Sequence, residues 1–174
     1  MSWTRAAIYW AGFLALFAYW AMSLRESPTP AAHVTRVAFL DVAEEQIVAV
    51  DVRRGDIEIR CRLVQGRWQV VEPAGRSVPP DLVAALVANL TQMPDVEVVA
   101  ERATNLAQFG LDHPTSQLVL GRKDGTAISV RLGTRNPAGT AVYAQREDGP
   151  RVYLIGLNVR YYEDLLFEAL RPAT

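Results

Sequence analysis

The chain has 174 residues, half of them hydrophobic, and its 18 Lys and Arg against 19 Asp and Glu give a net charge of −1. This length suits one folded domain, the near-neutral charge argues against a nucleic-acid partner, and the apolar content excludes a disordered chain. The single cysteine excludes an internal disulfide framework and a cysteine-based zinc site.

The first predicted element is a membrane-spanning helix. Residues 6–24 carry no charged side chain, and a helix of this length extends about 28 Å, close to the ~30 Å hydrocarbon core of a bilayer. A cleaved signal peptide is the alternative, but its apolar core is usually only ~7–15 residues long. Bulky residues such as Tyr9 and Trp10 also fit an anchor better. We therefore expect a transmembrane anchor at residues 1–26.

Charges beside this segment predict its orientation. Arg5 and the amino terminus precede it, whereas Arg25 and Glu26 follow it and cancel. The positive-inside rule then favours a cytoplasmic N-terminus, with the remaining chain outside the cytoplasm.

The faces of the predicted helix suggest how it packs. Small residues at steps of about one turn allow a second helix to approach closely, although a genome rich in alanine would give the same pattern. These residues are Ala7, Ala11, Gly12, Ala15 and Ala18. Trp3 and Trp20 are expected at the two membrane interfaces.

A short linker and one domain are expected after the anchor. Residues 27–33 contain Pro28 and Pro30, which favour an extended and semi-rigid segment. Residues 34–174 are long enough to bury a sizeable core. We therefore assign 27–33 as a linker and 34–174 as an extracytoplasmic domain.

The domain begins with a predicted three-stranded meander. Residues 47–52 are apolar except for Asp51 and open a strand. Residues 57–63 alternate apolar and charged, and residues 67–71 follow the turn at Gln65 and Gly66. Alternation of this kind is typical of half-buried strands joined by hairpins.

A helix and a second group of strands follow. Apolar residues recur at helical spacing between Asp81 and Met93, after prolines that suit a helix start. A short strand at 96–100 and a helical turn at 104–108 come next. Turns containing Asp-Gly then predict two hairpins, and an amphipathic helix is expected at 158–170. These are the strands of the two hairpins: 117–120, 127–132, 141–145 and 152–155. The predicted fold class is α+β, with the transmembrane helix, antiparallel hairpins and meanders, and two main amphipathic helices.

Several short motifs, taken in order, resemble one bacterial family. The run Phe109-Gly110-Leu111-Asp112-His113-Pro114 matches an aromatic-Gly-Leu-acid-x-Pro element, and other family-like pieces precede and follow it. They are Gly66-Arg67-Trp68, Leu132-Gly133-Thr134, Pro137-Ala138-Gly139, Ala141-Val142-Tyr143 and Arg151-Val152-Tyr153. Together they resemble the bacterial "domain of unknown function 4340" family, from about Val34 to Leu170.

The resemblance implies a location and a class of partner. Members of that family are typically anchored in the bacterial cytoplasmic membrane, with an extracytoplasmic, or periplasmic, region. They often occur beside ABC transporter components of the gliding-motility type. The family brings no established catalytic residues. This chain is shorter than many relatives, which also suits an accessory subunit of another membrane complex.

The residues that could carry chemistry are better explained structurally. Asp112 and His113 are adjacent and point in opposite directions on an extended segment, so Asp112 is expected to accept backbone N–H groups near Pro114. Cys61 alternates with Ile57 and Ile59 on the inward face of its strand, away from Arg60 and Arg62. It is therefore expected to be a buried free thiol.

Two glycine-containing segments are also expected to be connections. Residues 54–56 spell the adhesion tripeptide Arg-Gly-Asp, but they fit a hairpin turn in which the glycine supplies a positive φ. Residues 133–139 lack the Lys-Ser/Thr ending of a phosphate-binding loop. We therefore expect no enzyme activity, no cofactor and no metal.

An exposed aromatic face on the last helix is the candidate docking surface. It would comprise Tyr161, Tyr162 and Phe167, although core packing against the sheet is the favoured explanation of such residues. The leading hypothesis is a non-catalytic, single-pass membrane protein that acts as an accessory or scaffolding subunit. Its partners would be the lipid bilayer and integral membrane subunits of an ABC-type transporter or of a photosynthetic or respiratory complex. The alternative is a periplasmic ligand-binding or sensor module.

Overall fold

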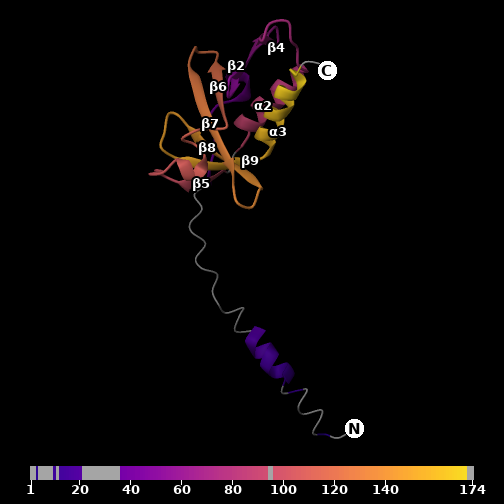
Figure 1. The fold of residues 1–174 in the computed structure, drawn as a ribbon, viewed down its shortest axis with the longest axis vertical. Helices are drawn as coiled ribbons and strands as arrows, with labels where there is room; N and C mark the ends of the chain where they lie inside the picture. Colours follow the sequence, from indigo (N-terminus) through magenta and orange to yellow (C-terminus); the bar gives the residue numbers. More distant parts are fainter. Residues whose placement is uncertain (1–2, 4–9, 11, 21–35, 94–95, 172–174) are drawn as a thin grey trace. The chain divides into compact units, whose positions relative to one another are not determined.

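A computed structural model describes residues 3, 10, 12–20, 36–93 and 96–171 of the chain (Figure 1). The chain divides into two compact units, Met1–Val34 and Thr35–Thr174, and each is described by itself.

The N-terminal unit corrects the predicted fold class. Residues 3, 10 and 12–20 are helical. Among the described residues, no helix combines the length and the apolar character that a membrane crossing requires. The transmembrane helix expected at residues 6–24 is therefore wrong for the part that the structure describes, and residues 4–9, 11 and 21–35 lie outside the described residues.

The side chains of this short helix have an aromatic face that the sequence analysis missed. Trp10, Phe13, Phe17 and Trp20 recur at three- and four-residue steps, and successive ring centroids lie 6.1, 6.4 and 5.8 Å apart. All four side chains are exposed.

The predicted membrane residues are only partly described. Gly12, Ala15 and Ala18 lie in the helix and are exposed, as are Trp3 and Trp20, whereas Ala7 and Ala11 lie outside the described residues. Helix packing and interface anchoring by these residues therefore stay predictions.

The second unit is built on one nine-stranded antiparallel sheet. Its order is β1-β5-β9-β8-β7-β6-β2-β3-β4, so a single sheet replaces the separate hairpins that were expected. The strands are β1 (Arg36–Val37), β2 (Ile47–Arg54), β3 (Ile57–Val64), β4 (Arg67–Glu72), β5 (Val96–Ala100), β6 (Ser116–Arg122), β7 (Ala127–Arg135), β8 (Ala141–Arg146) and β9 (Val152–Gly156). The link between the two groups of strands is the pairing of β2 with β6.

Tight turns set the register of the first meander. At Gln65 and Gly66 both φ angles are positive, 50° and 77°, as a two-residue type I′ hairpin requires. At the β2–β3 turn Gly55 has a φ of 58° and lies inside the pair Arg54–Ile57. The glycines therefore permit tight turns that hold β2 and β3 in register, so that their side chains alternate between the two faces of the sheet.

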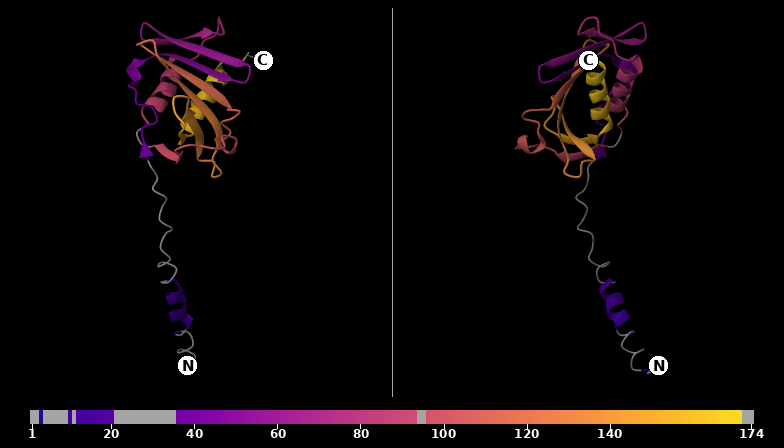
Figure 2. Two further views of the ribbon diagram at one scale, coloured as in Figure 1. Left: turned by 90° about the vertical axis from the view of Figure 1, so that its left-hand side faces the viewer. Right: turned by 45° about the vertical axis from the view of Figure 1, so that its right-hand side comes forward.

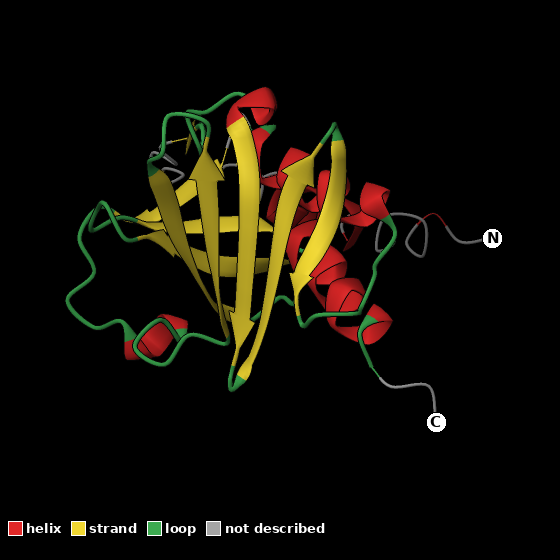
Figure 3. Ribbon diagram, turned by 90° about the horizontal axis from the view of Figure 1, so that it is seen from above, coloured by secondary structure: helices red, strands yellow, loops and turns green. Residues whose placement is uncertain are grey.

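Two helices, α2 (Pro80–Thr91) and α3 (Asn158–Ala169), pack together on one face of the sheet (Figures 2 and 3). Helix α2 begins at Pro80, where a missing N–H costs no hydrogen bond, and buries the stripe Val83, Leu86, Val87 and Leu90. The core between helices and sheet includes Val52, Ile59, Leu118, Leu132 and Leu166, each fully buried. Short 3-10 turns lie at η1 (Glu44–Gln46) and η2 (Ala107–Phe109).

Cys61 lies in this core, on the opposite face of β3 from its neighbours Arg60 and Arg62, and its side chain is fully buried. Burial raises the pKa of the Cys61 thiol to about 11, helped by the negative charge of Asp51. Because the thiolate is the reactive form, both the burial of Cys61 and its raised pKa make the thiol unreactive.

We expect a thiol reagent at pH 8 to leave the native full-length chain unlabelled and to label it within minutes in denaturant. Mass spectrometry of timed samples measures this, with Cys61→Ser as the unlabelled control. Rapid labelling of the native chain would contradict the buried position of the thiol.

Candidate functional site

The strongest candidate for a docking site is an apolar groove between the two helices. It lies where α2 begins and α3 ends, because the helices run antiparallel, and its volume is about 510 Å³. We call it the helix-pair groove; its lining is Pro79, Asp81, Leu82, Tyr162, Leu165, Glu168 and Ala169. The lining surface is almost entirely apolar, with the carboxylates of Asp81 and Glu168 contributed by exposed residues.

The three predicted docking residues occupy different environments. Tyr161 is 58% exposed and stacks edge-on against Tyr162, with ring centroids 5.4 Å apart. Tyr162 is half-buried and lines the groove. Phe167 is half-buried, and the Arg54 guanidinium lies 4.5 Å from its ring centroid. The structure therefore places Tyr162 in the groove lining, leaves Tyr161 exposed outside that lining, and places the Phe167 ring beside the Arg54 guanidinium.

A buried charge cluster that the sequence analysis missed fixes α3 to the sheet. Glu163 is fully buried, and its carboxylate lies 2.8 Å from the Arg54 guanidinium and 3.2 Å from that of Arg160. Arg160 also donates to the Ser116 hydroxyl at 3.3 Å and to the Gly133 carbonyl at 3.1 Å. The cluster therefore joins α3 to β2, β6 and β7.

The pKa values of the two arginines in this cluster are shifted in opposite directions. Burial lowers the pKa of the Arg160 guanidinium, an effect that the Glu163 carboxylate opposes. Burial also works against the charge on Arg54, but Glu163 and Asp164 outweigh it and raise the pKa of Arg54. Both arginines keep their charge at neutral pH, since a guanidinium loses its proton only far above it.

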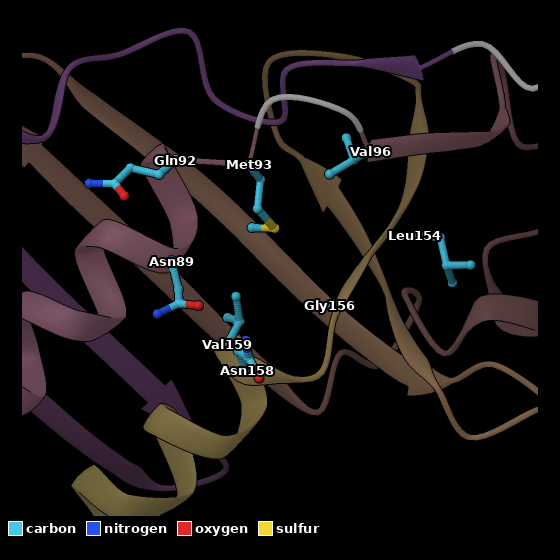
Figure 4. A pocket seen from close by; sticks show the side chains of 8 residues that line it. All are labelled: Asn89, Gln92, Met93, Val96, Leu154, Gly156, Asn158 and Val159. Atoms are coloured by element: carbon cyan, nitrogen blue, oxygen red, sulfur yellow. The ribbon is translucent and has the colours of Figure 1, made fainter.

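A second cavity lies at the opposite ends of the same two helices (Figure 4). Its volume is about 300 Å³, and three amide side chains, Asn89, Gln92 and Asn158, line it beside apolar residues such as Met93 and Val159. The Asn89 amide donates to the Ala85 carbonyl, so its oxygen remains free to accept. This amide cavity offers neutral hydrogen-bonding groups and no charged side chain in its lining.

The loop that carried the family-like motif is packed against the other face of the sheet. Phe109 and Leu111 are buried with Val152, and the Phe109 ring stacks edge-on against Tyr143 at 5.0 Å. Thr134 donates its hydroxyl proton to the Phe109 carbonyl at 3.2 Å. The motif therefore holds a small second core together.

Two facing glycines make this contact possible. Gly110 has a φ of 65°, and a Cβ there would lie 2.6 Å from the Thr134 Cγ2. A Cβ on Gly133 would lie 2.1 Å from the Phe109 carbonyl oxygen, so the backbone of the loop rests directly on β7. The motif residues are thus explained by packing.

A family model described as "Domain of unknown function (DUF4340)" matches residues 68–171. The chain belongs to this family. No curated protein and no solved structure matches the chain. The matched region of this DUF4340 domain contains α2, α3, the Phe109–Pro114 loop, the buried charge cluster except Arg54, and the strands from β4 onward.

The remaining candidate residues show no catalytic grouping. Asp112 accepts the backbone N–H of His113 at 2.8 Å, and both side chains are exposed. In the described part of the chain, no three His, Cys, Asp or Glu side chains group in a way that could hold a metal ion.

Proposed function

We propose that this DUF4340 protein is a non-catalytic accessory or scaffolding subunit of a larger complex at the bacterial cytoplasmic membrane. The helix-pair groove is the docking site in this proposal. The observation that carries it is an apolar groove of about 510 Å³ that is open to solvent and lined by Tyr162 and Leu165. Grooves of this kind accept the apolar face of a helix.

The charges beside the groove favour a partner of particular chemistry. Asp81 and Glu168 line it, and neither forms an ion pair with any residue that the structure describes. We therefore propose an amphipathic partner helix whose apolar side chains enter the groove and whose flanking Arg or Lys side chains pair with these carboxylates. Complementary charge of this type contributes mainly to the rate and specificity of association.

The proposed location rests on the N-terminal sequence. Residues 6–24 are uncharged, and the described helix at 12–20 exposes Trp, Phe and Leu side chains to solvent. An apolar surface of this composition favours association with a membrane or with other apolar helices. Subunits of an ABC-type transporter, or of a photosynthetic or respiratory complex, are the proposed partners.

The groove is tested by purification of the tagged full-length chain from washed membranes in mild detergent. We expect the wild-type chain to co-purify with a partner in a 1:1 ratio. The Leu165→Asp variant should retain at least tenfold less of this partner, because burying a charge opposes docking of an apolar surface. Val99→Asp is the matched control: Val99 is an exposed valine on β5, which does not line the groove. Circular dichroism checks that both variants fold.

Two outcomes would contradict this proposal. Equal recovery of the partner with Leu165→Asp would exclude the groove as the docking site. Recovery of the chain only in the soluble fraction would exclude the membrane location.

A ligand-binding or sensor module is the second candidate function. The amide cavity favours it, because a few polar groups placed among apolar residues are typical of small-molecule sites. Under this alternative the purified chain would be a monomer, and Asn89 and Asn158 would contact the ligand.

A further inference from the structure

Two motifs that the proposed function leaves unused meet in the folded domain. The turn at residues 53–56 and the loop at residues 112–114 are far apart in sequence. They become neighbours because β2 pairs with β6, which places Arg53 directly opposite Gln117. A cavity of about 440 Å³ lies between them.

This hairpin cavity is lined by hydrogen-bond donors. Its lining is Arg53, Gly55, His113, Pro114, Ser116 and Gln117. Four of these residues have side chains that can donate a hydrogen bond: a guanidinium, an imidazole, a hydroxyl and an amide. No carboxylate belongs to the lining. The cavity beside the β8–β9 turn differs, because there Glu101 and Asp148 already pair with Arg151 and Arg146.

The Arg53 guanidinium is available for a ligand. Its one hydrogen bond is a long contact of 3.4 Å from Nε to the Gly55 carbonyl, and it forms no ion pair within the described ranges. Glu58, which lies opposite Arg53 across the hairpin, is paired with Arg60 at 2.8 Å. The Asp112 carboxylate accepts the backbone N–H of His113.

The buried serine of the lining faces the other side of the sheet. Ser116 is only 2% exposed, and its Oγ accepts a hydrogen bond from the Arg160 guanidinium of α3 at 3.3 Å. Because neighbouring residues of a strand point to opposite faces, the paired residues Arg53 and Gln117 lie on the face away from this hydroxyl. The side-chain donors on the cavity side are therefore those of Arg53, His113 and Gln117.

We propose that the hairpin cavity binds the phosphate group of a small solute, either inorganic phosphate or a phosphomonoester. Three donors from separate side chains, those of Arg53, His113 and Gln117, match an anion with three or four oxygens better than a carboxylate with two. An unpaired arginine fork supplies the charge and the geometry that phosphate recognition requires. The helix-pair groove uses none of these residues, so the two proposals are tested independently.

The test is a titration of the ¹⁵N-labelled full-length chain in detergent, followed by amide NMR. Sodium phosphate and glycerol phosphate are added at constant ionic strength, with sodium chloride as the blank and sodium acetate as the carboxylate comparison. We expect saturable shifts of the Gly55, Ser116 and Gln117 amides by at least one phosphate compound. Saturation by inorganic phosphate alone indicates a free-anion site, and tighter binding of glycerol phosphate indicates a phosphomonoester. Acetate is expected to bind at least tenfold more weakly.

Variants distinguish phosphate binding in the cavity from nonspecific attraction of phosphate to positive charge on the surface. Arg53→Gln and His113→Gln are each expected to weaken phosphate binding, Arg53→Gln by at least tenfold. Arg67→Gln is the control, because Arg67 is an exposed arginine on β4 that lies outside the cavity lining. Shifts that do not saturate, acetate binding as tight as phosphate, or unchanged binding by Arg53→Gln would overturn the proposal.

Discussion

Gly133→Ala is expected to lower the free energy of unfolding by about 3 kcal/mol or more, because it adds an atom where there is no room. The new Cβ would lie 2.1 Å from the Phe109 carbonyl oxygen and 3.2 Å from the Gly110 carbonyl oxygen. Backbone atoms cannot move aside as a flexible side chain can. The loop would have to separate from β7 and lose the hydrogen bond from Thr134 to Phe109. Urea denaturation of the full chain, followed by circular dichroism, measures the change.

Two other glycines provide graded comparisons for this measurement. Gly149→Ala is expected to change stability by less than about 0.5 kcal/mol, because nothing lies within 4 Å of its added Cβ. Gly110→Ala is expected to have an intermediate effect on the free energy of unfolding. The left-handed φ at this position costs an alanine about 1–2 kcal/mol, and the new Cβ would also press on the Thr134 methyl group, which can move aside. Equal effects at Gly133 and Gly149 would show that the loop does not rest on β7.

Local sequence signals predicted the hairpins because each hairpin depends on a few adjacent residues. Gln65 and Gly66 adopt the positive φ angles that their turn requires. The alternation around Cys61 correctly predicted that Ile59 and Cys61 are buried, whereas Ile57, beside the turn, is exposed. The stripe from Leu82 to Met93 located α2 within two residues of its observed bounds. These features need no knowledge of distant residues.

Long-range pairing is what the sequence could not provide. Nothing local indicates that β2 pairs with β6, and this pairing converts separate hairpins into one sheet and creates the hairpin cavity. The N-terminal prediction failed for a different reason. Residues 3, 10 and 12–20 are helical, but the described residues hold no helix with both the length and the apolar character of a membrane crossing, and hydropathy alone could not show this.

The buried charge cluster was missed because charge normally indicates exposure. Arg54 was interpreted as a turn residue, and Arg160 and Glu163 were not singled out within the amphipathic helix expected at 158–170. Their spacing of three residues does place both on one side of α3, which is the only local signal that could have found the pair. Its burial depends on β2, β6 and β7, which precede it by many residues.

Glu163→Gln is expected to destabilise the chain by about 3 kcal/mol, because removal of one partner leaves buried charge uncompensated. The carboxylate is fully buried and contacts two guanidinium groups. Arg160 has no second carboxylate at hydrogen-bond distance in the described structure, whereas Arg54 retains Asp164 at 2.7 Å. Urea denaturation at low and high salt measures the effect. The loss should persist in high salt, since buried pairs are poorly screened.

The neighbouring Asp164→Asn is the matched control. Its carboxylate also pairs with Arg54, but the side chain is half exposed, so its loss should cost about 0–1 kcal/mol. The double variant Arg160→Met with Glu163→Met should recover much of the stability lost by Glu163→Gln, because two apolar side chains need no mutual pairing. If Glu163→Gln and Asp164→Asn behave alike, the cluster does not hold α3 against the sheet. A much larger loss of stability with Glu163→Gln than with Asp164→Asn would mean that one buried carboxylate fixes α3 against the sheet. The same carboxylate would then position a wall of the helix-pair groove and the Arg160 guanidinium that contacts Ser116.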